Sequence, residues 1–444
     1  MKNNDQPLSR AFVAVWIGQT VSEVGSMLSA IGAAVYVYLQ TGSAVWLGVL
    51  SALAAAPAII AVGFAPVVDR FPRRSVLLVA DIVAASGVVV ALGLAAAGRL
   101  EVWHLAVAGF IGGLGTAVQV SASQAAVTAL VEPEQYDRAN SLKQMGPAIG
   151  IVVGPVLATP LLAWWGIEMI LTIDLVTFAV GIGSVLAVRF DDAPPERSVN
   201  DDGSWRDMWA WLSGPGRPLL GLMVIGVVLN FSLAFVNIAM LAAATTLAGA
   251  ARSGLVLGLA GTAMIVGSLV SAAKDASDDR VGRIAMGLAV VGVGFAVAGS
   301  RPNAWVLGGG IAIALGAVPA VTATIASIYN ERVPPQMQGR VFALRLGLSN
   351  VLQPLGSVLA GVAIAHVAGP AVSDGMLTGS IGRVIGVGPS SGPALVLVAA
   401  GLVIAAIGLL IARYRPSRGR SLPRLFASVR GRSGEAALGL GLQA

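Results

Sequence analysis

The chain carries one stretch of sequence twice. Residues 131–142 read Val131-Glu-Pro-Glu-Gln-Tyr-Asp-Arg138-Ala-Asn-Ser-Leu142, and residues 333–344 read Val333-Pro-Pro-Gln-Met-Gln-Gly-Arg340-Val-Phe-Ala-Leu344. Both copies place Val, Pro, Arg and Leu at the same positions, 202 residues apart. A second echo relates Asp69-Arg-Phe-Pro-Arg73 to Asp279-Arg-Val-Gly-Arg283. Because repeats of this kind mark duplicated structural units, we expect two similar halves.

Long apolar runs surround these echoes. A helix that crosses the hydrocarbon core of a membrane needs about 20 mostly apolar residues. Twelve runs of this kind are present, at 11–39, 44–68, 75–98, 103–130, 139–163, 168–189, 218–248, 253–273, 284–300, 304–329, 340–366 and 392–412. The first echo lies between the fourth and fifth runs of each set of six, and the second lies between the second and third runs. The sequence therefore predicts an all-α, polytopic membrane protein with twelve transmembrane helices in two pseudo-symmetric halves.

The composition supports this class. The chain is 56% hydrophobic and 11% charged, whereas an average soluble chain is about 25% charged. This shortage of charge excludes a soluble globular protein. There is no Cys and there are two His residues, so we predict no metal site and no cofactor. No Gly-Lys-Ser/Thr phosphate loop is present, which argues against ATP as the energy source.

The basic residues predict an orientation. If the N-terminus is cytoplasmic, all but four of the 28 Lys and Arg residues fall on the cytoplasmic side, the exceptions being Arg99, Arg252, Arg301 and Arg383. Cytoplasmic loops of membrane proteins carry this excess. We therefore expect both termini to lie in the cytoplasm, with the chain in the plasma membrane. Anchoring to the lipid bilayer explains the basic charge, so no nucleic acid partner is expected.

The longest polar interval divides the runs into six and six. We predict an N-terminal half at 1–190, a cytoplasmic linker at 191–217, a C-terminal half at 218–415 and a basic tail at 416–444. The linker ends in a segment with Trp205, Trp209 and Trp211, which is typical of a short interfacial helix. Duplicated halves that meet at a central site are the plan of secondary transporters, which move a small molecule by rocking one half against the other.

Several motifs carry a family resemblance. The loop Gly63-Phe-Ala-Pro-Val-Val-Asp69-Arg70-Phe-Pro-Arg73-Arg74 resembles the signature loop of the major facilitator superfamily, and Gly146-Pro147-Ala-Ile-Gly150-Ile-Val-Val-Gly154-Pro155 resembles its antiporter motif. The segments Gly18-Gln19-Thr-Val-Ser-Glu23-Val-Gly25 and Gly339-Arg340-Val-Phe342 are similar to the drug:proton antiporter branch, which includes macrolide and enterobactin exporters. The resemblance covers about residues 10–415 and implies a monomeric exporter with the major facilitator fold.

The signature loop is expected to act as a gate. The carboxylate of Asp69 can cap the N-terminus of a neighbouring helix, and Arg73 and Arg74 can pair with acids such as Asp81 or Asp137. Such a latch would hold the cytoplasmic side closed. The alternative interpretation of the arginines is ordinary anchoring at the cytoplasmic surface. The predicted gating residues are Gly63, Asp69, Arg70, Arg73, Arg74 and Asp81.

The antiporter-like motif has a repeating small residue. Gly146, Gly150 and Gly154 are four apart, so they share one helix face and permit close approach of a second helix. Pro147 and Pro155 bend a helix. The resemblance implies that this bend controls closure against the eighth span, while the alternative is ordinary small-residue packing.

Three acids fall inside predicted spans. A charge at the bilayer centre costs about 2.5–3.5 kcal/mol on insertion scales, so Glu23, Asp81 and Asp174 are functional candidates. Glu23 lies near the middle of the first span, and we identify no Lys or Arg deep in any span to neutralise it. Desolvation would favour its protonated form, which suits a proton-coupling carboxylate. Asp174 is a second candidate for proton coupling, with a structural or gating role as its alternative, and Asp81 is expected to pair with the arginine loop.

Polar and aromatic residues deep in the spans predict a substrate cavity, since such groups in a mostly apolar pocket suit an amphiphilic ligand. For each one, a hydrogen bond between helices is the alternative. The predicted cavity residues are Gln19, Met27, Gln119, Gln124, Asn230, Phe231, Phe235, Asn237 and Gln353.

These features predict a secondary transporter, not an enzyme, that exports amphiphilic drug-like compounds in exchange for protons. Because the charge within the spans is acidic, cationic or neutral cargo is favoured. Three alternatives remain open: an exporter of a siderophore or endogenous secondary metabolite, an integral-membrane lipid-linked transferase, and a sensor or scaffold on the same fold.

Overall fold

The computed structural model describes residues 8–59, 71–132, 135–188, 205–273, 279–334, 337–373, 375 and 377–413. All regular secondary structure in these ranges is helical. The first half contains α1 (Arg10–Thr41), α2 (Ala44–Ala55), α4 (Arg73–Ala96), α5 (Val102–Leu130) and α6 (Tyr136–Ala187). After α7 (Trp205–Ser213), the second half contains α8 (Arg217–Ala248), α9 (Ala250–Ala273), α10 (Arg280–Ala298), α11 (Ala304–Arg332), α12 (Gln338–Val362), the π-helix η3 (Ala363–Ala368), α13 (Gly369–Ser373), α14 (Gly382–Ile385) and α15 (Ser391–Arg413).

Ten helices in the described ranges are long and apolar enough to cross a membrane. Gly166 has φ 77° and ψ −177°, which breaks the helical path inside α6. Its two parts, residues 136–165 and 167–187, match the predicted fifth and sixth spans. The predicted second span begins as α2 and continues to Ile59 as a shorter apolar segment, and residues 60–68 lie outside the described ranges. Helices are therefore present in all twelve predicted spans.

The eleventh predicted span is longer than expected. Its helix continues from α12 through the π-helical turn of η3 into α13, so its apolar segment ends at Ser373. The predicted linker segment 191–204 and the tail 416–444 lie outside the described residues. The end of the linker forms the short helix α7, which was expected from its tryptophans.

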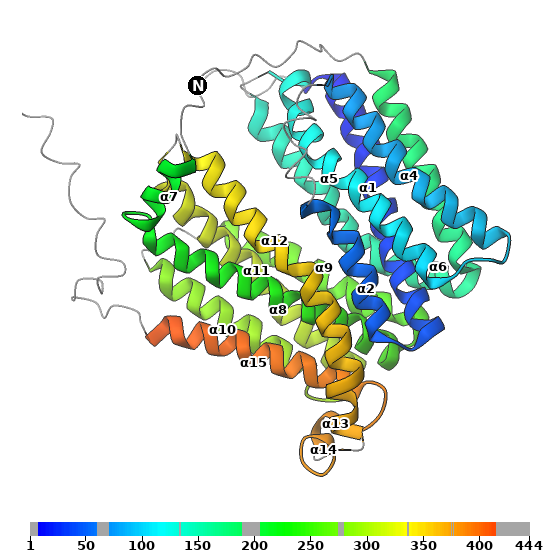
Figure 1. Ribbon diagram of the computed structural model, residues 1–444, viewed down its shortest axis with the longest axis vertical. Helices are drawn as coiled ribbons and strands as arrows, with labels where there is room; N and C mark the ends of the chain where they lie inside the picture. Colours follow the sequence, from blue (N-terminus) through cyan, green and yellow to red (C-terminus); the bar gives the residue numbers. More distant parts are fainter. Residues whose placement is uncertain are drawn as a thin grey trace, which may run out of the picture.

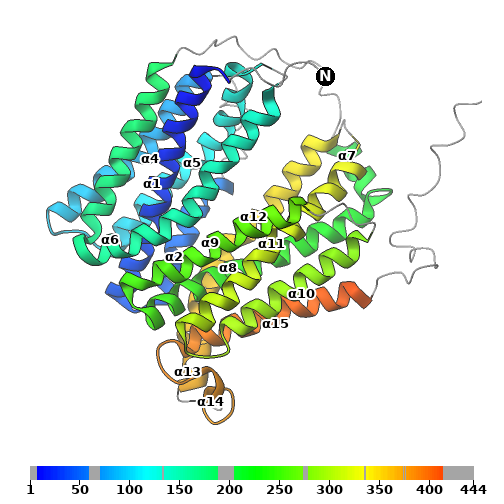
Figure 2. The same ribbon diagram turned by 180° about the vertical axis from the view of Figure 1, so that it is seen from behind.

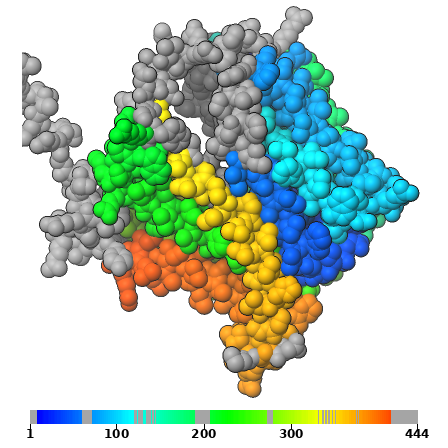
Figure 3. Space-filling view, in the orientation of Figure 1, coloured from blue at the N-terminus to red at the C-terminus, as the bar shows by residue number. Residues whose placement is uncertain are grey.

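The helices form two bundles (Figures 1 and 2). The bundles converge at the end of the molecule that carries α13 and α14, here called the α13 end. They diverge toward the opposite end, here called the α7 end, where the first described residues and α7 lie. In the space-filling view the surface of α2 lies directly against that of α12 (Figure 3). The two bundles are thus joined at one end.

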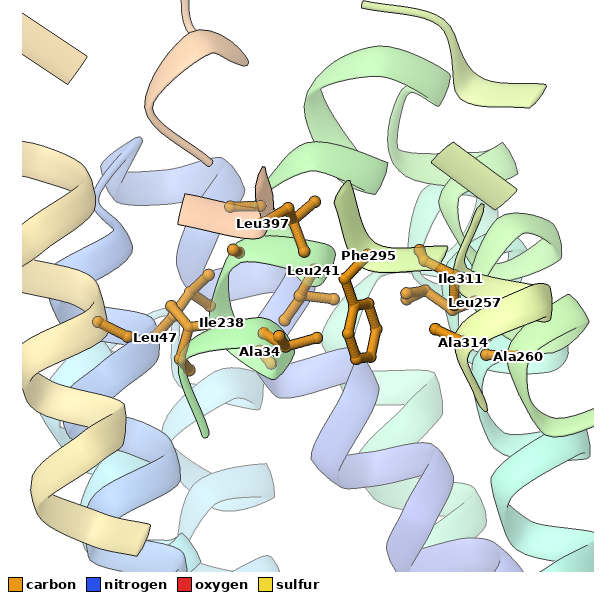
Figure 4. Packing of buried hydrophobic residues seen from close by; sticks show 14 of the residues in the cluster. Ala34, Leu47, Ile238, Leu241, Leu257, Ala260, Phe295, Ile311, Ala314 and Leu397 are labelled. Carbon is orange, nitrogen blue, oxygen red and sulfur yellow. The ribbon is translucent and has the colours of Figure 1, made fainter. Parts of the chain in front are cut away.

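Apolar packing is continuous across this joined end. Ala34 of α1 and Leu47 of α2 belong to the same buried cluster as Ile238 of α8 and Phe295 of α10 (Figure 4). Close backbone contacts add to it. A Cβ on Gly48 or on Gly361 would overlap the backbone of the facing helix, α12 or α2 respectively. Small residues at these positions let the two bundles approach closely.

Candidate functional site

The candidate site is organised around α1, which packs between the two parts of α6. A Cβ on Gly18, Gly25 or Gly32 would overlap side chains of the second part of α6. Two hydrogen bonds fix the start of α1. Ser9 Oγ accepts from Phe12 N and donates to the carbonyl of Leu130. This packing places the middle of α1, with Glu23, beside the first part of α6.

A cavity of about 470 Å³ lies at this junction, which is within the size range of drug-binding pockets. Its wall combines hydroxyl and amide groups with apolar side chains and two opposite charges. The lining residues are Ser22, Glu23, Ser26, Met27, Ala30, Ala84, Thr116, Gln119, Ser123, Lys143, Pro147, Gly150 and Phe178. They come from α1, α4, α5 and both parts of α6. A smaller cavity beside it shares Glu23, Gln119, Ser123 and Lys143, and adds Gln19 to the wall.

Lys143 corrects one expectation from the sequence. We expected no basic group deep in a span near Glu23, but Lys143 of α6 lines both cavities with it. The two charges interact electrostatically. The Nζ atom of Lys143 is buried and has no hydrogen-bond partner among the residues described. The cavity wall therefore carries a basic group as well as an acidic one, so its charge does not by itself favour cationic or neutral cargo.

A sequence signal for Lys143 was present. It precedes Gly146 by three residues and Gly150 by seven, so it lies on the same helix face as the glycines. That face points at α1, because a Cβ on Gly146 would overlap the Glu23 carboxylate and one on Gly150 would contact Met27. Counting Lys143 with the bases of the cytoplasmic side obscured this position. The serines at 22, 26 and 123 were also missed, since single serines in a span carry no distinctive pattern.

Asp81 takes part in a polar network instead of the expected arginine pairing. It is 1% exposed. Its Oδ2 accepts from Gln19 Nε2 at 2.9 Å and its Oδ1 from Gln119 Nε2 at 2.8 Å. Gln119 Nε2 also donates to Gln19 Oε1. The network joins α1, α4 and α5, and it explains how a carboxylate is accommodated there, since buried charges need hydrogen-bond partners. The two predicted cavity glutamines are thus brought together with Asp81.

Asp174 lies in the second part of α6 and is 2% exposed. Its Oδ1 accepts from Ser26 Oγ at 3.3 Å. Ser26 lines the large cavity, and so does Phe178, one turn after Asp174. Asp174 itself does not line that cavity. It supports the cavity wall through Ser26, and its coupling role remains a prediction.

The signature loop is described only in part. Gly63, Asp69 and Arg70 lie outside the described residues. Arg74, in the first turn of α4, donates from Nη2 to the carbonyl of Leu186 at 2.8 Å. Leu186 is in the last turn of α6, where carbonyls lack intrahelical partners and attract cations. Arg74 therefore ties two helices of the first half together by a carbonyl contact.

The segment of the second half that echoes the signature loop lies within the described residues from Asp279 onward. Asp279, which echoes Asp69, caps α10 by accepting from Gly282 N at 2.8 Å. Arg280 pairs with Glu331 at the end of α11, with both Nη atoms 2.6 Å from the carboxylate. The hydrogen bonds from Arg280 lower the pKa of Glu331 below its ordinary value of 4.5. Helix capping, predicted for Asp69, is thus observed at the equivalent acid of the repeat.

The antiporter-like motif packs against two helices, α1 and α9. Gly146, Gly150 and Gly154 face Glu23 and Met27 of α1. The close approach to α9, which is the eighth span, is made by the glycines of α9 itself. Gly254 contacts the backbone of Pro155, its N–H donates to Thr159 Oγ1 at 3.0 Å, and Gly261 contacts the backbone of Ile151. Pro147 and Pro155 both lie inside α6, as expected.

The predicted cavity residues of the second half do not reach the 470 Å³ cavity. Asn230 Nδ2 donates to the carbonyl of Gly226 within α8 at 2.9 Å. The rings of Phe231 and Phe235 pack in a tilted arrangement with their centroids 5.2 Å apart. Asn237 is exposed and Gln353 is half-buried. Met27 and Gln119 of the first half do line the cavity, and the side chain of Gln124 lies outside the described residues.

The comparisons with known proteins agree with this architecture. A family model described as Major Facilitator Superfamily matches residues 15–357. The chain belongs to this superfamily. Macrolide efflux protein A of Streptococcus pyogenes is 24% identical over 363 residues, which cover 79% of this chain and 88% of that protein. A macrolide efflux protein A of Enterococcus faecalis is 24% identical over 300 residues, which cover 65% of this chain and 91% of that protein.

Solved structures of other transporters share the fold of this superfamily member. A bacterial homolog of the human lysosomal transporter Spinster, in an inward-facing and unoccupied conformation, aligns with TM-score 0.69 and 14% identity, covering 91% of this chain and 96% of that one. The D-xylose-proton symporter aligns with TM-score 0.66 and 14% identity, covering 91% and 98%. The protein is therefore a multi-pass membrane transporter for small molecules and not an enzyme, which removes the transferase alternative.

Proposed function

We propose that this superfamily member exports amphiphilic, drug-like compounds in exchange for protons. One observation carries the proposal: the Glu23 carboxylate faces a 470 Å³ amphiphilic cavity between α1, α5 and α6. A carboxylate in such a wall can hold either a proton or a basic group of the cargo. Because the two compete for one site, uptake of a proton releases the cargo. The macrolide efflux relatives support the direction of transport.

The arrangement of the two bundles supports an alternating-access cycle. The bundles are joined at the α13 end by α6 against α9 and by α2 against α12. With both termini in the cytoplasm, as the distribution of basic residues favours, this is a state that loads cargo from the cytoplasm. Rocking the halves would break both contacts and open the cavity to the outside. One chain in the plasma membrane supplies every group in this cycle, so a monomer is sufficient.

A second candidate cargo is a siderophore or an endogenous secondary metabolite. Lys143 in the cavity wall favours it, since an ammonium group attracts an acidic group. Its exchange for a proton at Glu23 would also require a basic nitrogen on the cargo.

The proposal is tested by transport into inside-out membrane vesicles with an imposed pH gradient, acidic inside. Ethidium serves as a fluorescent cation and rhodamine B as a fluorescent zwitterion. Wild-type vesicles should accumulate at least one of them, and an ionophore that collapses the gradient should abolish accumulation. Glu23→Gln should abolish it as well. Glu168→Gln makes the same substitution at an exposed position and should behave as wild type.

Two outcomes would contradict the proposal. Wild-type accumulation that survives collapse of the gradient excludes proton antiport. Full gradient-driven transport by Glu23→Gln shows that another group carries the proton.

A further inference from the structure

The two charges in the large cavity are not directly paired. Glu23 and Lys143 both line it, but no direct ion pair forms between these two described residues. The Nζ atom of Lys143 is buried without a hydrogen-bond partner from those residues. The cavity therefore presents an acid and a base side by side, each with its charged end available to a ligand.

This arrangement is costly without a ligand. A buried ammonium needs a counter-charge and hydrogen-bond acceptors, and the electrostatic influence of Glu23 supplies only part of that need. The other carboxylates near the cavity do not supply the rest. Asp81 is held by Gln19 and Gln119, and Asp174 is held by Ser26. An acidic group on the cargo would complete the site.

We propose that the cargo is a zwitterionic amphiphile, whose acidic group binds Lys143 and whose basic nitrogen binds Glu23. This inference rests on the proposed function and specifies its substrate class. The remaining wall suits such a molecule. The Ser22 hydroxyl adds a polar group to the wall, and Met27 and Phe178 offer apolar surface.

The direction of coupling also requires both charges. A basic nitrogen competes with the proton for Glu23, and this competition is what exchanges one for the other. A cargo with an acidic group alone would bind Lys143 best after Glu23 has taken up a proton, because the ammonium then has no counter-charge. It would therefore travel with the proton and would not be exported. The zwitterion keeps the exchange at Glu23 and gains a second contact at Lys143.

A matched set of fluorescent probes tests this. Nε-dansyl-lysine carries both an amine and a carboxylate, its methyl ester keeps the amine alone, and its Nα-acetyl derivative keeps the carboxylate alone. In the inside-out vesicle assay, wild-type protein should transport the zwitterion with an apparent KM about tenfold lower than the ester, the effect of one hydrogen bond to a charged group. Wild-type protein should not transport the acetyl derivative.

Variants at Lys143 separate binding from folding. Lys143→Gln should raise the apparent KM for the zwitterion about tenfold and leave that for the ester unchanged. Lys143→Arg keeps the charge and should restore most of the preference. Arg99→Gln removes a base at an exposed position and should change neither. If Lys143→Gln fails to reach the membrane, the ranking of the three probes by wild type still decides.

The possible failures are distinguishable. Gradient-driven transport of the ester, with no preference for the zwitterion, overturns the inference and leaves the proposed function intact. The inference is also overturned if Lys143→Gln raises the apparent KM for the zwitterion and for the ester by the same factor. If wild type moves none of these probes and neither ethidium nor rhodamine B under a gradient, the proposed function fails together with the inference.

Discussion

Replacing Gly254 should open the joined end of the molecule. In the present arrangement, a Cβ at Gly254 would overlap the carbonyl of Pro155 and the hydroxyl of Thr159 in α6. Both are held by helix backbone or by a hydrogen bond to Gly254 N itself, so neither can move aside easily. Overpacking of this kind costs about 1–3 kcal/mol. Since about 1.4 kcal/mol changes an equilibrium tenfold, Gly254→Val should shift the balance away from the joined state by about fivefold to about a hundredfold.

The shift can be measured by the distance between two spin labels. The chain contains no Cys, so labels can be attached to introduced cysteines without altering others. Trp165→Cys and Arg252→Cys place labels at exposed positions on α6 and α9, on either side of this contact. Gly254→Val should move the distance distribution toward longer values. Gly221→Val is the matched control, because a Cβ there meets open space.

An unchanged distribution in Gly254→Val, with labels that report normally, would refute the reasoning. It would mean that the contact between α6 and α9 does not hold the joined end closed. A lengthening that appears equally in Gly221→Val would point to a general effect of valine in these helices.

Three further predictions follow from the polar contacts. Gln119→Leu removes the donor to Asp81 Oδ1 and should lower the free energy of unfolding by about 1–3 kcal/mol, seen as a lower melting temperature in detergent, whereas an unchanged value would contradict the network. Asp279→Ala removes the cap of α10 and should cost about 1 kcal/mol in the same assay, while Asp279→Asn, which can still cap, should lose much less. Arg280 lowers the pKa of Glu331, so this pair stabilises the folded state above pH 4.5, the ordinary value for the group, and its contribution fades as the pH falls further. Wild type and Glu331→Gln should therefore differ in melting temperature near neutral pH and converge in acid, and a constant difference would count against the pair.

Much of the fold could be predicted from the sequence, because the long apolar runs that determine it are local features of the chain. Long apolar runs must be helices in a membrane, since backbone groups there need internal partners. The repeat around Arg138 and Arg340 supported the division into halves. The break at Gly166 falls in the short interval 164–167 that separates the predicted fifth and sixth spans, where Gly166 is the turn residue. The extension of the eleventh span into α13 was missed because its π-helical turn leaves no pattern in the sequence.

The site was less predictable, because contacts between helices depend on rotation and depth. Periodicity placed Gly146, Gly150 and Gly154 on one face, but it could not show that this face meets α1 and not α9. Asp81 was assigned to the nearest arginines along the chain, whereas its partners Gln19 and Gln119 come from two other helices. Lys143 was counted with the cytoplasmic bases because it lies near the start of the predicted fifth span, 139–163.

The most direct test of the account is whether cargo binding at Glu23 displaces a proton. Purified protein in weakly buffered detergent, with a pH indicator, is titrated with the fluorescent probe that it transports best. Wild type should release about one proton for each probe bound near neutral pH, because the basic nitrogen of the probe and the proton compete for one carboxylate. Glu23→Gln should release none on binding the probe. Equal proton release by the two proteins, or binding to wild type without any release, would contradict the account.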